Sequence, residues 1–265
     1  MTNQPTSSAT KVVLVTGATS GIGRATCLLL AEKGQHVAAI GRREERLAEV
    51  VAEAENLPGE ILPLAADVRD GEAMQRVAAQ AFDHFKRLDV LVANAGIGHR
   101  GTLVESDWDD IETTLRTNID GVMHTIRACV PYVRQGSGGH IITISSVLGP
   151  VPGPGASIYS ASKAALDSLA QALRIELKAD NIWVTNLIVG QTHTEFATKR
   201  LGHSGKVASK WPTMTSDRVA EKIVWAMHHR RRTIILRWLD RGFVLVGRFL
   251  PWVMDRILAK IYLKR

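Results

Sequence analysis

The sequence has few cysteines and no cluster of metal-ligating residues. Only Cys27 and Cys129 occur among its 265 residues, which excludes a disulfide scaffold and a cysteine-rich metal site. The nine histidines, including His228 and His229, show no metal-ligand spacing, so we expect no metal. Both thiols are expected to be buried, because free cysteine packs as a small apolar side chain.

The chain also lacks an export signal and a long hydrophobic run. Its first ten residues are polar and do not resemble a signal peptide. No charge-free apolar run approaches the ~20 residues of a membrane-spanning helix. We therefore expect a cytoplasmic protein, and 265 residues suit a single α/β domain.

Positive charge is concentrated at one end of the chain. The net charge is +7, yet residues 230–265 alone contain ten lysines or arginines and two acids. Residues 1–229 are thus close to neutral, which argues against nucleic-acid binding by the whole protein. The basic stretch needs an explanation of its own.

Strand-like and helical segments alternate along most of the sequence. Short apolar runs begin near Val12, Val37, Ile61, Val90, His140 and Trp183, and helical patterns separate them. Such alternation predicts βαβ units, with a parallel sheet covered by helices on both faces. We expect a loose tail over residues 1–10, an α/β domain over residues 11–229 and an extension over residues 230–265.

A glycine cluster lies between the first predicted strand and the first predicted helix. It reads Thr16-Gly17-Ala18-Thr19-Ser20-Gly21-Ile22-Gly23. Glycines at this place let the backbone approach a pyrophosphate, and the free N–H groups of the next helix bind phosphate. The spacing differs from the general dinucleotide fingerprint, so a tight turn without a ligand is the alternative.

A second polar group is expected at the same edge of the sheet. Tyr159 and Lys163 are four residues apart, which places them on one face of a predicted helix. Ser146 directly follows a predicted strand. Because strand C-termini line the ligand crevice of a doubly wound sheet, we expect these side chains to meet the glycine turn.

These motifs together resemble the classical short-chain dehydrogenase/reductase family. The match runs from about Lys11 to Trp225 and includes Ala93-Asn94-Ala95-Gly96, Asn118, Ser146 and the Tyr159–Lys163 pair. The resemblance implies a single Rossmann-like, doubly wound domain with a seven-stranded parallel sheet of order 3-2-1-4-5-6-7. It also implies a nicotinamide cofactor and hydride transfer between an alcohol and a carbonyl compound.

The resemblance further assigns catalytic roles. Tyr159 would act as general acid or base, and Lys163 would lower its pKa, which is ordinarily near 10. Ser146 would orient the substrate oxygen, with Ser145 on the opposite face of the strand as the alternative. Asn118 would hold a water behind Lys163, and Asn94 would brace the centre of the sheet.

The cofactor is expected to be NADP(H). NAD-preferring relatives place an acid at the end of the second strand, whereas this chain has Arg42 and Arg43, which suit a 2′-phosphate. Val189 stands where the family often has proline, which relaxes the turn beneath the nicotinamide. The further cofactor contacts implied by the resemblance are Gly17, Thr19, Ser20, Gly21, Ile22, Gly23, Asp67, Val68, Asn94, Ala95, Gly96, Tyr159, Lys163, Gly190, Thr192 and Thr194.

An apolar stripe at helical spacing runs through the basic extension, with a break expected near Pro251. It consists of Leu239, Phe243, Val246, Leu250, Val253, Ile257 and Ile261. Trp238, Trp252 and basic residues beside it fit a peripheral membrane contact on the cytoplasmic face. Packing on the protein itself or on a partner subunit is the alternative.

The sequence as a whole favours an NADP(H)-dependent oxidoreductase that interconverts a small carbonyl compound and an alcohol. The substrate is lipophilic if the extension contacts a membrane, and residues 195–212 would form a lid over it. The alternatives are an NAD-linked alcohol dehydrogenase with the same residues and a non-catalytic NADP-binding protein acting through its basic tail. The resemblance implies a homodimer or homotetramer formed through residues 109–132 and 159–177, and we expect no nucleic-acid partner.

Overall fold

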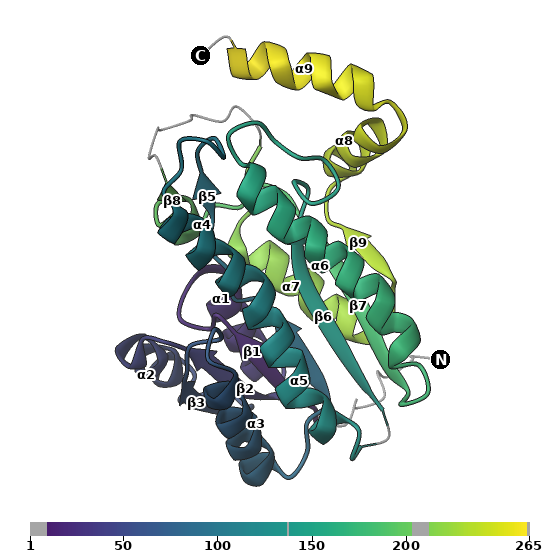
Figure 1. Cartoon of the computed structure of the whole chain (residues 1–265). Coiled ribbons are helices and arrows are strands. Elements are labelled where there is room, and N and C mark those ends of the chain that lie inside the picture. The colour runs from purple at the N-terminus through teal and green to yellow at the C-terminus, as the bar shows by residue number, and fades with distance from the viewer. Residues whose placement is uncertain (1–9, 137, 203–211, 264–265) are drawn as a thin grey trace.

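The computed structural model describes residues 10–136, 138–202 and 212–263. The predicted N-terminal tail, apart from residue 10, and the middle of the predicted lid lie outside these ranges. Seven strands form one parallel sheet in the spatial order β3-β2-β1-β4-β6-β7-β9 (Figure 1). Their bounds are β1 Val12–Thr16, β2 His36–Gly41, β3 Ile61–Ala65, β4 Val90–Ala93, β6 Gly139–Ser146, β7 Ile182–Val189 and β9 Thr233–Ile235. Numbered within this sheet alone, the order is 3-2-1-4-5-6-7, so the expected Rossmann-like topology is confirmed.

Alternating side chains build a hydrophobic core on each face of the sheet. In β1, Val12 and Leu14 belong to one core, while Val13 and Val15 belong to the other. The first core is covered by α3 (Gly71–Phe85), α5 (Gly121–Val133) and α6 (Ser157–Glu176). The second is covered by α1 (Gly21–Glu32), α2 (Glu44–Glu53) and α7 (Ser216–His228). Cys27 and Cys129 are free and buried, as expected, and burial raises the pKa of each thiol to about 12.

The helix predicted over residues 109–132 is interrupted. Helix α4 (Trp108–Leu115) leads into a π-helical turn, η1 (Arg116–Asp120), and only then into α5. In η1 the Gly121 N–H donates to the Arg116 carbonyl, five residues back. Thr117 and Asn118 are buried within this wide turn.

A second, two-stranded sheet lies beyond the C-terminal end of β4. It joins β5 (His99–Arg100) to β8 (Leu201–Gly202) in parallel. This pairing brings the segment that follows β4 beside the segment that follows β7, which contains the short 3-10 helix η2 (Glu195–Ala197).

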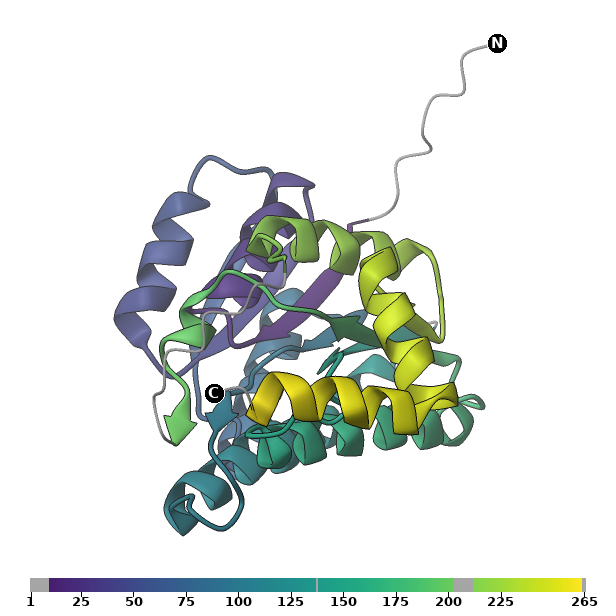
Figure 2. The ribbon, with the colours of Figure 1, turned by 90° about the horizontal axis from the view of Figure 1, so that it is seen from above.

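The extension begins with a strand and continues with two helices. Strand β9 pairs with β7, so the sheet continues past residue 229, where the sequence suggested that the α/β domain ends. Helices α8 (Trp238–Phe249) and α9 (Pro251–Leu263) follow, and the break between them is at the expected place. Seen from above, both form an outer layer at this end of the molecule (Figure 2). Within the described ranges, no helix is both long enough and apolar enough to span a bilayer.

Candidate active site

The turn between β1 and α1 brings backbone segments unusually close together. Gly17 and Gly21 have φ angles of 70° and 52°, which glycine adopts without strain. A Cβ atom on Gly23 would collide with the Gly17 carbonyl oxygen. The Ser20 side chain makes no capping hydrogen bond, and Ile22 follows in the first turn of α1. The described turn therefore presents helix N–H groups that can bind phosphate.

Thr16 and Asn94 fasten this turn to β4. The Thr16 hydroxyl accepts the N–H groups of Asn94 and Ala95 at 3.1 and 3.0 Å. The Asn94 amide donates to the Thr16 carbonyl at 2.8 Å. Asn94 thus links two neighbouring strands beside the glycine turn, where the sequence suggested a bracing role.

The two arginines after β2 have different partners. Arg43 Nη2 donates to the Thr19 hydroxyl at 2.9 Å, whereas Arg42 Nη1 lies 3.6 Å from Asp67 Oδ2. Burial raises the pKa of the Asp67 carboxyl, but hydrogen bonds from Arg69 outweigh burial and lower that pKa overall. Arg43 therefore lies against the glycine turn, whereas Arg42 lies near the Asp67 carboxylate that follows β3.

Val68 is buried beside the same region. A Cβ atom on Gly121 would lie 2.6 Å from Val68 Cγ2, so Val68 packs directly on α5. Its carbonyl contacts His124 Nδ1 at 3.1 Å. Asp67 and Val68 thus provide one charged and one apolar side chain shortly after the end of β3.

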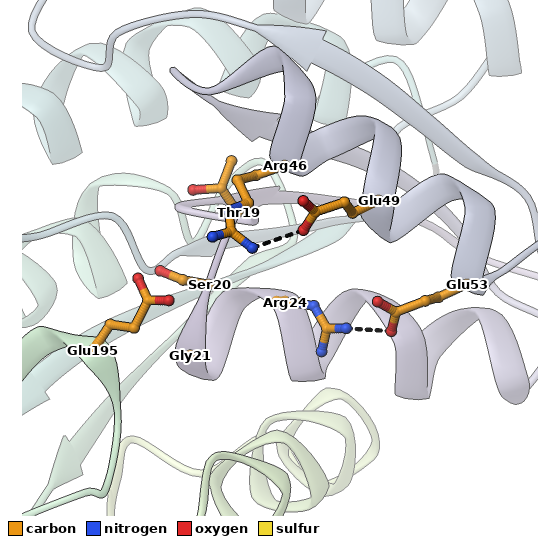
Figure 3. Close-up of a pocket in the computed structure, with 8 residues that line it drawn as sticks. All are labelled: Thr19, Ser20, Gly21, Arg24, Arg46, Glu49, Glu53 and Glu195. Carbon is orange, nitrogen blue, oxygen red and sulfur yellow. Dashed lines mark hydrogen bonds and ion pairs between the residues drawn. The ribbon is translucent and has the colours of Figure 1, made fainter.

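A pocket of about 420 Å³ continues from the glycine turn between α1 and α2 (Figure 3). Its lining is Thr19, Ser20, Gly21, Arg24, Arg46, Glu49, Glu53 and Glu195. Arg24 pairs with Glu53 and Arg46 with Glu49, and Glu195 lies 3.7 Å from Arg43. Arg46 was not predicted as a site residue, because the sequence indicates it only by its place three residues after Arg43.

Ser146, Tyr159 and Lys163 meet at the C-terminal end of β6. Ser146 lies close enough to Tyr159 for its hydroxyl to lower the pKa of the phenol, and Lys163 Nζ lies 5.7 Å from the centre of the Tyr159 ring. The Ser145 hydroxyl points the other way and donates to the Lys163 carbonyl at 3.3 Å. The structure therefore turns Ser146, rather than Ser145, toward Tyr159.

Burial dominates the pKa values of this group. It raises the pKa of Tyr159 to about 12, and the Ser146 hydrogen bond and the charge of Arg200 lower it less. Burial also lowers the pKa of Lys163 to about 8, against the opposing charge of Asp167. The expected lowering of the Tyr159 pKa by Lys163 is not found in this arrangement. The Lys163 ammonium instead donates to the Ile144 carbonyl at 2.9 Å.

Asn118 is fully buried and joins three parts of the site. Its Oδ1 accepts the Ile97 N–H at 2.8 Å, and its Nδ2 donates to the Ile97 carbonyl at 2.9 Å and the Ser162 hydroxyl at 3.0 Å. A Cβ atom on Gly96 would lie 3.1 Å from Asn118 Oδ1 and 3.5 Å from Lys163 Nζ. Asn118 therefore fixes the segment after β4 against α6, close to Lys163.

Asp167 is a further charged residue of the site that the sequence analysis did not single out. It lies one turn after Lys163 on α6 and accepts from Asn186 Nδ2 at 2.7 Å. Burial raises its pKa, while the Ser145 hydroxyl, the hydrogen bond from Asn186 and the charge of Lys163 oppose the rise. Spacing alone could have indicated Asp167 in the sequence, because Tyr159, Lys163 and Asp167 recur at steps of four residues along one helix.

The segment that leaves β7 reaches both the glycine turn and Tyr159. A Cβ atom on Gly21 would lie 3.3 Å from the Thr194 side chain, and Thr192 forms a β-bridge with Met214. The Phe196 and Tyr159 rings are 5.8 Å apart in an edge-on arrangement. Thr194 thus contacts the glycine turn, and Phe196, two residues further on, contacts Tyr159.

Gly190 lies against a buried ion pair that belongs to the extension. Arg237 and Asp240 form two hydrogen bonds of 2.8 and 2.6 Å, and their side chains are 12% and 1% exposed. A Cβ atom on Gly190 would lie 2.5 Å from Arg237 Nη2 and would collide with Asp240. The extension is therefore fixed directly to the segment that carries Gly190, a contact that no sequence motif indicated.

Comparisons with known proteins agree with this geometry. A family model described as short chain dehydrogenase matches residues 11–203. A 3-oxoacyl-(acyl-carrier-protein) reductase from Thermotoga maritima is 37% identical over 189 residues, covering 71% of this chain and 77% of that protein.

Two solved structures are also similar. A short chain dehydrogenase/reductase from Burkholderia phymatum, in complex with NAD, has a TM-score of 0.81 at 27% identity, covering 89% of this chain and 92% of that one. An alcohol dehydrogenase from the archaeon Thermococcus sibiricus, complexed with 5-hydroxy-NADP, has a TM-score of 0.78 at 26% identity, covering 86% and 96%. These two neighbours carry different nicotinamide dinucleotides.

Proposed function

This chain belongs to the short-chain dehydrogenase family and is an oxidoreductase of CH–OH and C=O groups, and we propose that it uses NADP(H) with Tyr159 as general acid and base. One observation carries the proposal. Ser146, Tyr159 and Lys163 meet at the C-terminal end of β6, beside a glycine turn whose backbone can bind a pyrophosphate.

Each residue of the group has a separate task. The Ser146 hydroxyl donates to the substrate oxygen and holds it beside the Tyr159 hydroxyl. Tyr159 gives its proton to that oxygen during reduction and takes the proton back during oxidation. The nicotinamide, when bound, supplies or accepts the hydride. Lys163, whose pKa is about 8, can exchange a proton near neutral pH, through a water held beside Asn118.

The Tyr159 phenol serves the two directions of the reaction in different protonation states. Reduction needs the phenol as an acid, and the phenol is the form present at neutral pH. Oxidation requires the phenolate, which a positive charge close to the ring would have to stabilise.

Arg42, Arg43 and Thr19 support NADP(H) as the cofactor. A guanidinium binds phosphate in a bidentate way, and both arginines lie where a 2′-phosphate on the adenosine ribose is expected. Their present partners, Asp67 and Glu195, are 3.6 and 3.7 Å away. Such exposed pairs are worth about 0–1 kcal/mol, so a phosphate can displace them. The same acids favour the second candidate, an NAD-linked enzyme, because they partly neutralise the arginines.

We further propose a small lipophilic substrate and a homodimer or homotetramer. Met123 on α5 and Ile175 on α6 are exposed apolar side chains, which supports contact between subunits through these helices. The exposed apolar side chains of α8 and α9 support a location at the cytoplasmic face of a membrane, from which a lipophilic carbonyl compound would be drawn.

The test is oxidation of NADPH, and separately of NADH, with ketones and aldehydes that range from small polar to lipid-like. We expect turnover with NADPH that is lost in Tyr159→Phe, while that variant still binds NADPH. Arg42→Ala should raise the KM for NADPH but leave the KM for NADH unchanged. Full activity in Tyr159→Phe would contradict the acid–base role. Folded protein that binds NADPH but turns over no carbonyl compound would favour a non-catalytic function.

A further inference from the structure

Helix α8 carries large apolar side chains on the side that faces away from the protein. Asp240 and Val244 are buried against the domain. Trp238, Leu245 and Phe249 lie on the opposite side and are 78%, 54% and 70% exposed. A surface helix in water has the reverse arrangement, with polar residues outward. The outward side of α8 is therefore suited to an apolar environment.

Helix α9 presents tryptophan and basic residues together. Met254 is buried, whereas Trp252, Ile257 and Ile261 are exposed. The Arg256 guanidinium lies 5.4 Å from the centre of the Trp252 ring. Tryptophan and arginine side by side are typical of the zone between lipid headgroups and acyl chains.

The exposed charges of the two helices are mostly positive. Arg241, Arg248, Arg256 and Lys260 are exposed, and within the described part of the helices Asp255 is the one exposed acid. In a two-fold dimer this face would contact the same face of a second copy of the chain. The two positively charged faces would then repel each other. An anionic lipid surface instead complements the charge.

The two helices pack over the loop that connects Ser146 to Tyr159. Gly247 lies against the Val151 side chain, and a Cβ atom on Gly155 would lie 3.3 Å from the Tyr262 ring. The Gly155 carbonyl also accepts the Gly101 N–H at 3.0 Å. This places α9 beside the catalytic end of the molecule, above the sheet in Figure 1.

The loop before α4 extends the same region. Leu103 and Val104 lie two and three residues after Gly101 and are 58% and 93% exposed. Figure 1 places β5 and the start of α4 at the end of the molecule that α8 and α9 cover. Exposed apolar side chains from two distant parts of the sequence thus gather at one end, and large exposed apolar patches mark interaction sites.

We propose that the outward sides of α8 and α9, with Leu103 and Val104, form a docking face for a bilayer that contains anionic phospholipid. Docking in this way turns the catalytic end of the protein toward the membrane. A lipophilic carbonyl compound then reaches Tyr159 from the bilayer rather than from water. The supply of substrate rests on the proposed function, whereas docking itself does not.

The test is sedimentation of the full chain with vesicles of phosphatidylcholine alone or of phosphatidylcholine mixed with phosphatidylglycerol. We expect binding to the mixed vesicles, weakened by salt. The triple variant Trp238→Ser, Leu245→Ser, Phe249→Ser should lose binding. The control Gln75→Ser changes an exposed side chain of α3, which lies at the end of the molecule opposite α8 and α9 in Figure 1, and it should bind as the wild type does.

A double charge variant tests whether the basic residues of α8 and α9 contribute to docking. Arg248→Gln with Lys260→Gln should weaken binding to the mixed vesicles by about fivefold for each charge removed. Arg76→Gln, on α3, is the control and should have no effect. Thermal unfolding of each variant verifies that it folds, which we expect because the replaced side chains are exposed.

Three outcomes would overturn the proposal. They are no binding to mixed vesicles at low salt, equal binding to both vesicle types, and binding by the triple variant equal to that of the wild type. A change of oligomeric state in the triple variant, measured by light scattering, would assign the face to a second copy of the chain. Tyr159→Phe should bind vesicles normally, so a failure of the proposed function is distinguishable from a failure of docking.

Discussion

Replacing Asp240 with asparagine is expected to weaken cofactor binding, although Asp240 is not itself placed in the cofactor site. Its carboxylate forms two hydrogen bonds with Arg237 and lies against Gly190. Asparagine keeps the shape of the side chain but removes its charge. Arg237 is then left almost buried without an opposite charge, which is unfavourable.

The magnitude follows from the burial of the pair. Removing one partner of a buried ion pair destabilises a protein by ~3–5 kcal/mol. We expect the lower end, about 3 kcal/mol, because the asparagine amide oxygen can still accept one hydrogen bond. The protein can avoid the cost of the unpaired Arg237 charge if α8 detaches from the segment after β7, which exposes Arg237 to water. If binding requires that segment in place, the loss of NADPH affinity has an upper limit of about 150-fold.

The assay is a fluorescence titration of NADPH, with thermal unfolding measured in parallel. The control is Asp255→Asn, which removes an exposed carboxylate from α9 and should change neither quantity. A lower unfolding temperature with an unchanged Kd for NADPH would refute the coupling and leave the pair a purely structural anchor. A Kd and a stability both equal to those of the wild type would refute the energetic argument itself.

Two further predictions concern Gly190 and Lys163. Gly190→Ala should destabilise the protein by ~1–3 kcal/mol and raise the KM for NADPH, because the new Cβ collides with Asp240. The control is Gly242→Ala, whose new Cβ meets nothing within 4 Å, and equal effects of the two changes on urea unfolding would contradict the contact. Burial lowers the pKa of Lys163 from 10.5 to about 8, so between these pH values the unfolded chain binds more protons. The unfolding free energy of the wild type should therefore rise by up to about 3 kcal/mol between pH 8 and 10.5, relative to that of Lys163→Met. If the difference in unfolding free energy between the two proteins does not change with pH, the lowered pKa of Lys163 is contradicted.

The sequence predicted the parts of the fold that depend on local patterns. Apolar runs such as Val12–Val15 predicted buried strands, and the glycine turn with Tyr159 and Lys163 predicted the position of the site. The resemblance implied a seventh strand, but the local pattern did not locate β9, because its three residues follow a run of arginines and form a strand only by pairing with β7. The π turn around Asn118 likewise depends on partners, Ile97 and Ser162, that are distant in the sequence.

Electrostatics was the least predictable part of the site. Lys163 was expected to lower the pKa of Tyr159, but desolvation of both groups follows from the packing of α6 on β6 and cannot be deduced from spacing. Arg237 and Asp240 have the spacing of an ordinary surface pair, whereas in the fold the pair is buried and lies against Gly190. In the extension, Trp238 and Trp252 were expected to take part in a membrane contact, whereas the exposure of Leu245 and Phe249 was not expected and depends on how α8 packs on the domain.

The all-parallel sheet gives the molecule two edges that can evolve separately. The C-terminal ends of the strands carry the glycine turn, the catalytic group and the extension, whereas tight turns such as those at Lys86 and Asn181 return the chain to the other edge. Both residues have left-handed backbone angles, with φ of 59° and 54°, which glycine adopts more easily. Insertions, reporter groups or stabilising replacements at these turns can therefore accumulate without changing the chemistry, while specificity diverges at the opposite edge.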